Sequence, residues 1–412
     1  MINRRCFLGA LGAGAGALSV WPGLACAAAD DPRLLVVLLR GGLDSLHAVP
    51  PYGDPAYKVL RGAQAISPDA ATPAHGLDAT FALHPSLAFS AQLYARGEFL
   101  PVVAIAPPYW GRSHFDAQDC VENGTATPHG ADTGWLNRVA AFVPSAAPLA
   151  VASVMPLMMR GPSPVSSWSP PLPVRVNPVL LQRLEGLYGA DPNLSAAFAQ
   201  AIAEQPGEES IEQDMQRGDP AEVAPPAARG LAANPARRKR RDVNASLPGL
   251  MAAAARFLEQ ASGPRIAFVE DYGWDTHANQ AAILARKLSE LDRGYSAFEA
   301  GMGSAWSRTV VVTVTEFGRT AALNGTGGTD HGTGAAMFLC GGAVRGGRVA
   351  GTWPGLSPTA LYERRDLHAT SDLRAAFKGV LADHLRVHHD ALDRAVFPGS
   401  DRITPLTGLV RS

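Results

Sequence analysis

Short apolar runs recur along the chain, and polar or amphipathic stretches separate each run from the next. Runs rich in Val, Leu, Ile and Ala predict buried strands, because a strand that is covered on both faces lacks polar alternation. They lie at residues 33–39, 99–105, 149–153, 265–270, 308–315 and 335–340. Stretches with helical spacing or high alanine content predict helices at residues 83–96, 178–203, 247–260, 278–302 and 370–385. The alternation predicts an α/β fold with a mostly parallel central sheet and helices on both faces.

Polar side chains gather just after four of these strands. They are Asp44; Ser113, His114 and Asp116; Asp275 and His277; and Glu316, which is followed by Asp330 and His331. Because a parallel sheet brings the carboxyl ends of its strands to one edge, we expect these side chains to converge. Carboxylates and imidazoles without cysteine favour a divalent metal, Zn, Mn, Mg or Ca, held singly or as a pair.

Two of the clusters have a simpler explanation. Asp44 can cap the helix that follows it, in place of binding a metal. Ser113 and Asp116 have the spacing of a capping box, which leaves Arg112 and His114 unexplained beside them. For these positions the sequence leaves cap and site open.

The third cluster points more firmly to a site. Asp275 can cap the helix at 278–302, but His277 has no such role. The two residues are two apart on an extended segment, so their side chains point to the same side, as a shared metal requires. A different group of histidines is predicted to lie on the surface, namely His368, His384, His388 and His389.

Composition limits the class of protein. The chain has 412 residues, of which 47% are hydrophobic, so it can bury a large core. Its formal charge of -1 gives no support to a nucleic-acid partner. Cys120 and Cys340 are the two cysteines beyond the N-terminal segment, and they either form a disulfide or remain free thiols.

The N-terminus resembles a bacterial export signal. Arg4 and Arg5 precede hydrophobic residues, and a weakly apolar run leads to small residues around Cys26. This order is similar to a twin-arginine signal, with an ordinary secretory signal, a retained anchor or a lipid anchor as alternatives. It predicts a signal peptide over residues 1–29, the twin-arginine export machinery as a partner, and a periplasmic or secreted protein without a membrane span in its mature part.

One segment differs in composition from the rest. Residues 205–246, approximately, are rich in Pro and Ala and contain a basic run at 237–241. We expect a flexible insertion there, since no aromatic residue is interleaved with the basic run to suggest an anionic partner. The expected organisation is therefore a single α/β domain over residues 30–412, interrupted by this insertion.

The clusters together resemble a known group of enzymes. Their order is similar to that of the alkaline phosphatase and sulfatase superfamily, and more closely to a twin-arginine-exported bacterial family known by its domain of unknown function fifteen-oh-one. The matching motifs are Arg40-Gly41-Gly42-Leu43-Asp44, Ser113-His114-Phe115-Asp116, Gly273-Trp274-Asp275-Thr276-His277, Thr315-Glu316-Phe317-Gly318-Arg319 and Asp330-His331-Gly332-Thr333-Gly334. The resemblance covers nearly all of the mature chain and implies an alkaline-phosphatase-like fold.

The resemblance also implies roles for single residues. The implied metal ligands are Asp44, Asp275, His277, Glu316, Asp330 and His331. Ser113 is the implied nucleophile, and Arg112 and Arg319 are the implied groups for substrate oxygens. The sequence departs from the superfamily at Phe317, where an imidazole usually follows the acidic residue.

Two functions follow from these observations. The first is an exported, metal-dependent hydrolase of phosphate or sulfate esters that acts on a small-molecule or polymeric substrate through Ser113. The second is a catalytically silent periplasmic binding or assembly factor on the same fold, which the altered ligand set at Phe317 favours.

Overall fold

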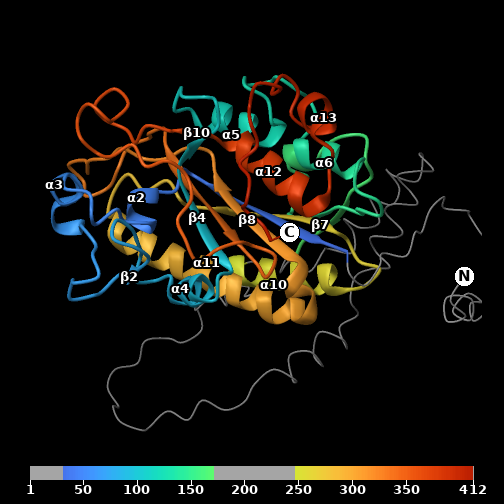
Figure 1. Ribbon diagram of the computed structural model, residues 1–412, viewed down its shortest axis with the longest axis horizontal. Coiled ribbons are helices and arrows are strands. Elements are labelled where there is room, and N and C mark those ends of the chain that lie inside the picture. The colour runs from blue at the N-terminus through green and yellow to red at the C-terminus, as the bar shows by residue number, and fades with distance from the viewer. Residues whose placement is uncertain (1–30, 171–245, 412) are drawn as a thin grey trace, which may run out of the picture. The chain divides into compact units, whose positions relative to one another are not determined.

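The computed structural model describes residues 31–170 and 246–411, which form one unit around an eight-stranded sheet (Figure 1). The expected signal peptide, the helix at 178–203 and the insertion at about 205–246 lie outside the described residues, apart from Ser246. In sheet order the strands are β10 (Ser371–Asp372), β4 (Phe99–Ala106), β9 (Ala335–Cys340), β8 (Thr309–Thr315), β1 (Arg33–Arg40), β7 (Ile266–Tyr272), β5 (Leu149–Val151) and β6 (Ser166–Trp168).

The sheet is parallel except for one strand. β1 pairs in parallel with both β7 and β8, and β5 does so with β6 and β7. β9 runs antiparallel to β4 and to β8. The carboxyl ends of β1, β4, β7 and β8 therefore share one edge of the sheet, and β9 starts at that same edge. This direction brings the residues before β9 to the same place as the residues that follow the other strands.

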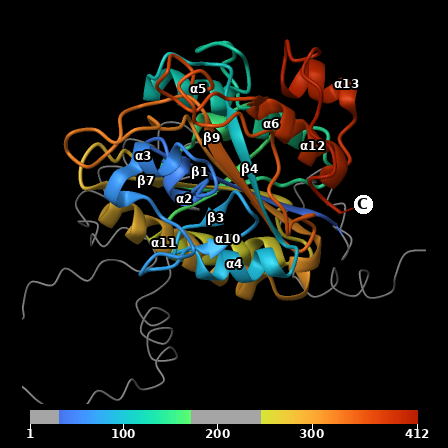
Figure 2. The same ribbon diagram turned by 60° about the vertical axis from the view of Figure 1, so that its left-hand side comes forward.

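Helices cover both faces of the sheet (Figures 1 and 2). On one face lie α4 (Ala88–Ala95), α10 (Leu247–Glu259) and α11 (Gln280–Met302), and on the other lie α5 (His114–Asn123), α6 (Trp135–Ala140) and α12 (Leu373–Leu385). Alternate residues of β1 enter the two cores: Leu35, Val37 and Leu39 pack with the first group, and Leu34, Val36 and Leu38 with the second. Alternation in a strand points successive side chains to opposite faces, so an uninterrupted apolar run fills two cores at once.

Short elements complete the described part of the chain. They are α2 (Ser45–Ala48), α3 (Tyr57–Arg61), η1 (Gly62–Gln64), β2 (His75–Gly76), β3 (Ala82–Leu83), η2 (Leu157–Met159), η5 (Gly303–Arg308), α13 (His389–Ala391) and η6 (Leu392–Val396). Among the helices of residues 31–170 and 246–411, none combines the length and the apolarity that crossing a membrane requires.

The predicted fold class is confirmed, with differences at the ends of elements. The expected helix at 83–96 is shortened to α4, because its first residue, Leu83, pairs in the small β2–β3 ladder and the helix begins only after Leu87. α11 begins after Asn279, so Asp275 does not cap it. Cys120 and Cys340 are both buried and are not bonded to each other, which excludes the disulfide.

His384 was predicted to lie on the surface, and this is wrong. It is 8% exposed on the inner side of α12, and its Nε2 lies 2.9 Å from the carbonyl oxygen of Arg33. Burial disfavours the charged imidazole and lowers the pKa of His384 to about 4. Because the unfolded chain binds this proton more readily, His384 stabilises the fold fully above about pH 6.5, and this contribution is lost as the pH falls toward 4.

We expect His384→Gln to make the free energy of unfolding less dependent on pH. Glutamine keeps an N–H group for the Arg33 carbonyl but cannot take up a proton. Between about pH 6.5 and 4, the slope of the unfolding free energy with pH should decrease by up to about 1.4 kcal/mol per pH unit. Urea unfolding over this pH range measures the slope. The control is His389→Gln, because His389 is exposed. A slope equal to that of the wild type would contradict the assignment.

Candidate metal centre

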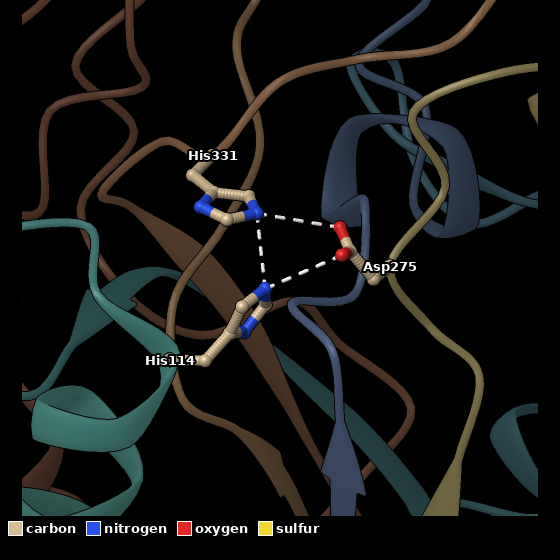
Figure 3. Close-up of side chains that lie close together, drawn as sticks. All are labelled: His114, Asp275 and His331. Carbon is tan, nitrogen blue, oxygen red and sulfur yellow. Dashed lines mark hydrogen bonds and ion pairs between the residues drawn. The ribbon is translucent and has the colours of Figure 1, made fainter.

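Three histidines and one aspartate meet at the carboxyl edge of the sheet. His114 is the first residue of α5 and follows β4, Asp275 and His277 lie between β7 and α11, and His331 precedes β9. Figure 3 shows the rings of His114 and His331 directed toward the carboxylate of Asp275. One ligand atom from each of these three residues lies within 4.8 Å of the others.

The Nε2 atoms of the three imidazoles face one another. His331 Nε2 lies 2.9 Å from His114 Nε2 and 3.0 Å from His277 Nε2. The Asp275 carboxylate is 3.0 Å from His277 Nε2, 3.4 Å from His331 Nε2 and 3.5 Å from His114 Nε2. His114, Asp275 and His331 therefore form a compact group of ligand atoms, and His277 Nε2 lies beside two of them.

Each of these rings is held by a hydrogen-bond acceptor at its other nitrogen. His114 Nδ1 lies 2.8 Å from Glu316 Oε1, and His277 Nδ1 lies 3.2 Å from Asp330 Oδ1. His331 Nδ1 lies 3.0 Å from the backbone carbonyl of Arg112, which can only accept. In the neutral rings the proton therefore sits on Nδ1 and leaves a lone pair on each Nε2.

Lone pairs that face one another at about 3 Å repel, and a carboxylate beside them adds negative charge. A divalent cation between them satisfies all four groups, and an imidazole anchored through its second nitrogen is the usual arrangement of a metal-binding histidine. Tetrahedral zinc with bonds of about 2.0–2.1 Å separates neighbouring ligand atoms by about 3.3–3.4 Å. The separations among His114, Asp275 and His331, 2.9 to 3.5 Å, match this size, and His277 Nε2 lies 3.0 Å from both His331 Nε2 and Asp275. These three residues thus fit one divalent metal, with His277 beside them.

The carboxylates of the centre are kept ionised by their partners. Burial alone raises the pKa of Asp275, but the hydrogen bond and charge of Arg319, whose Nη1 lies 2.6 Å from Asp275 Oδ1, outweigh it and lower that pKa. Burial likewise opposes ionisation of Glu316, and hydrogen bonds from His114 and Gln118 lower its pKa. An ionised Asp275 is the form that binds a metal.

Close approach of the backbone depends on glycine at Gly41 and Gly328. A Cβ atom on Gly41, whose φ is +125°, would lie 2.4 Å from the amide nitrogen of Asp275. One on Gly328 would lie 2.2 Å from the carbonyl carbon of His277. Either side chain would displace a segment that carries a ligand, so both glycines fix the position of the centre.

Asp44 does not join the other predicted ligands. It is 1% exposed, caps α2, and pairs with the fully buried Arg61 through both carboxylate oxygens. Gln280 Nε2 donates a further hydrogen bond of 2.6 Å to Asp44 Oδ2. Since these oxygens are occupied by protein donors, the prediction that Asp44 binds the metal is corrected to a structural role.

Glu316 and Asp330 contact the histidines of the centre on the side away from the proposed metal position. Both contact histidine Nδ1 atoms instead of the central point. Glu316 is 0% exposed and also accepts hydrogen bonds from the Gly41 amide and Gln118. Their predicted role as ligands is therefore corrected to one of holding His114 and His277 in place.

The predicted catalytic residues also have other partners. Arg112 pairs with Glu363 at 2.5 Å and Asp366 at 2.8 Å, and Arg319 pairs with Asp275. Both guanidinium groups thus pair with carboxylates of the protein, and their role in holding substrate oxygens stays a prediction. Ser113 caps α5, and its Oγ accepts a long hydrogen bond of 3.5 Å from the Asp116 amide and also interacts with the Tyr109 side chain.

His114 was noticed in its cluster but was not predicted as a ligand. Its signal was its position between a helix cap and the rest of α5, where a capping box does not need an imidazole. The Phe317 ring packs 4.8 Å from the ring of His114 and 5.0 Å from that of His331. Phe317 thus lies against two of the imidazoles of the centre without offering a ligand atom.

We expect Asp44→Asn to destabilise the fold while leaving the metal content unchanged. The substitution leaves Arg61 as a buried charge without its counter-ion, which costs about 3–5 kcal/mol in comparable cases. Urea unfolding gives the loss of stability, and elemental analysis of the zinc-loaded protein gives the metal content. The control is Asp401→Asn, because Asp401 is exposed. Loss of zinc from folded Asp44→Asn protein would return Asp44 to the ligand set.

Comparisons with known proteins agree with the family indicated by the motifs. The solved structures similar to this chain include one titled as BT1596, a 2-O GAG sulfatase, with 9% identity, 91% of this chain and 73% of that chain covered, and a TM-score of 0.36. Another is the PsFucS1 sulfatase from Pseudoalteromonas sp., which is 13% identical and has a TM-score of 0.39. The match covers 93% of this chain and 74% of that chain. No curated protein matches the chain. The family model described as "Protein of unknown function (DUF1501)" matches residues 113–396, more than half of the chain, and the protein belongs to that family.

Proposed function

We propose that the protein is a mononuclear metal-dependent hydrolase of phosphate or sulfate esters. The observation that carries the proposal is the close group of His114 Nε2, His331 Nε2 and the Asp275 carboxylate, with His277 Nε2 beside the last two. Each of the three rings is oriented by an acceptor at Nδ1, as metal sites require. The ligands would be His114, Asp275, His277 and His331.

The ligand types indicate which metal the protein would hold. Imidazole-rich sites suit zinc and other transition metals, whereas magnesium and calcium take oxygen ligands almost entirely. Of the four metals considered from the sequence, zinc is therefore favoured over manganese, magnesium and calcium. Such a cation would supply Lewis acidity, which polarises an ester oxygen and favours ionisation of a nearby hydroxyl group or water molecule.

The centre is accessible from solvent. The side chains of His277 and Asp275 are 47% and 40% exposed, unlike those of a closed structural site. Ser113 directly precedes His114, so its hydroxyl group lies on the segment that carries a ligand. The capping bond of Ser113 Oγ is long, and a nucleophile would have to give it up together with the contact to Tyr109 in order to turn toward a substrate.

We also propose that the protein acts outside the cytoplasm, after export by the twin-arginine machinery. The support is the order of Arg4 and Arg5, the hydrophobic residues that follow and the small residues near Cys26. Replacing Arg4 and Arg5 by lysine should retain the protein in the cytoplasm, and cell fractionation measures it. An equal distribution of the two forms would contradict export by this route.

A specific observation favours a second candidate, a catalytically silent binding factor. Arg112 and Arg319, the arginines expected to hold substrate oxygens, are both engaged in ion pairs within the protein. A protein of this kind would bind metal but hydrolyse none of 4-nitrophenyl phosphate, bis(4-nitrophenyl) phosphate and 4-nitrophenyl sulfate. Hydrolysis of any of these esters that disappears in His331→Ala would exclude it.

We expect Ser113→Ala to abolish ester hydrolysis while zinc binding persists. The matched control is Ser246→Ala, since Ser246 caps α10 through a similar bond of 3.4 Å to the Gly249 amide. Loss of either cap should lower stability by about 0.5–2 kcal/mol, so stability alone does not distinguish the variants. Only Ser113→Ala should lose turnover of the nitrophenyl esters. Full activity in Ser113→Ala would remove Ser113 as the nucleophile and leave a metal-activated water in that role.

A further inference from the structure

A cavity of about 230 Å³ adjoins the metal centre. Its apolar wall is formed by Leu60, Leu323 and Leu361, and its polar wall includes Arg364 and Arg365. Asp330 belongs to both places, because it lines the cavity and its Oδ1 contacts the Nδ1 atom of His277. A group bound in the cavity therefore lies next to a residue that orients a metal ligand.

The charges of the polar wall are unequally matched. Among the described residues, none pairs with the guanidinium of Arg364, which is exposed. Arg365 shares Asp366 with Arg112, so one carboxylate faces two guanidinium groups. The third charged group of the wall, Asp330, already accepts hydrogen bonds from His277 and from Asn324 Nδ2 at 3.1 Å. Arg364 is thus left without a partner among the described residues, whereas Arg365 pairs with Asp366 and interacts with the charge of Asp330.

The backbone that carries Arg364 has an unusual conformation. Glu363 and Arg364 have φ values of +50° and +55°, a region that residues with a side chain rarely adopt. Two reciprocal backbone hydrogen bonds between Tyr362 and Asp366 close the turn. The guanidinium of Arg112 also donates a hydrogen bond to the Glu363 carboxylate. Conformations of this kind persist where surrounding structure imposes them, and they cluster at ligand sites. Here the imposed turn is the one that brings two arginines to the cavity.

We propose that this cavity is a subsite for an anionic substituent of the substrate. The three leucines accommodate an apolar body, and Arg364 and Arg365 bind a carboxylate or sulfate group carried by it. The volume suits one substituted ring, since a cavity of about 150 Å³ is enough for benzene. The assignment of the occupant to the substrate rests on the proposed hydrolase function. The substrates would then be organic esters that carry a second anionic group away from the bond that is cleaved.

Benzoate and its neutral isostere benzamide test the subsite by calorimetry on the zinc-loaded full chain. We expect benzoate to bind more tightly than benzamide, and Arg364→Gln to weaken benzoate by on the order of tenfold or more while leaving benzamide unchanged. Ala322→Phe places a ring at an exposed position of the cavity wall and should weaken both compounds. Arg402→Gln removes an exposed arginine outside the lining and should behave as the wild type.

The outcomes separate the subsite from the hydrolase. Equal affinity of benzoate for the wild type and for Arg364→Gln would overturn the subsite, including the case in which benzoate binds to the zinc alone. Failure of both compounds to bind, or a preference for benzamide, would also overturn it. Because this measurement involves no turnover, selective benzoate binding in a protein that hydrolyses no ester would reject the hydrolase and retain the anion site.

Discussion

The hydrogen bonds at the Nδ1 atoms of three histidines determine what this edge of the sheet can do. Glu316, Asp330 and the Arg112 carbonyl hold the three rings so that their Nε2 atoms lie close together beside Asp275. Without these acceptors, each ring could turn or change tautomer. A divalent cation, or a proton that one Nε2 donates to the next, offsets the repulsion between the lone pairs, and the hydrogen bond to Glu316 favours the protonated form of His114 by raising its pKa.

A series of buried hydrogen bonds leads from Asp44 to Asp275. Asp44 accepts from Gln280, whose Oε1 accepts from Thr329, and Arg319 donates to Thr329 and to Asp275. Members of such a network are costly to remove singly, because each leaves a buried partner unsatisfied. Asp44 therefore stabilises the fold at one end of this chain of hydrogen bonds, and Arg319 and Asp275 lie at the other end.

Local patterns predicted the strands well, because uninterrupted apolar runs such as that of β1 are needed to fill two cores. They also placed Asp275, His277 and His331 at one edge. They failed where a distant residue decides the outcome: Arg61 occupies Asp44, and Glu316 turns His114 toward the centre. The antiparallel direction of β9 and the burial of His384 against Arg33 likewise depend on tertiary contacts. A sequence shows which groups are available, whereas their partners depend on packing.

The most direct test of the metal centre is the coordination of zinc in the loaded protein, measured by X-ray absorption. The account predicts one zinc ion per chain with three imidazole nitrogens and at least one oxygen at about 2.0–2.1 Å. His114→Ala should reduce the imidazoles to two, because His114 is the ligand that α5 contributes. A second metal at about 4 Å, as in two-metal sites, or an unchanged imidazole count in His114→Ala, would contradict the account.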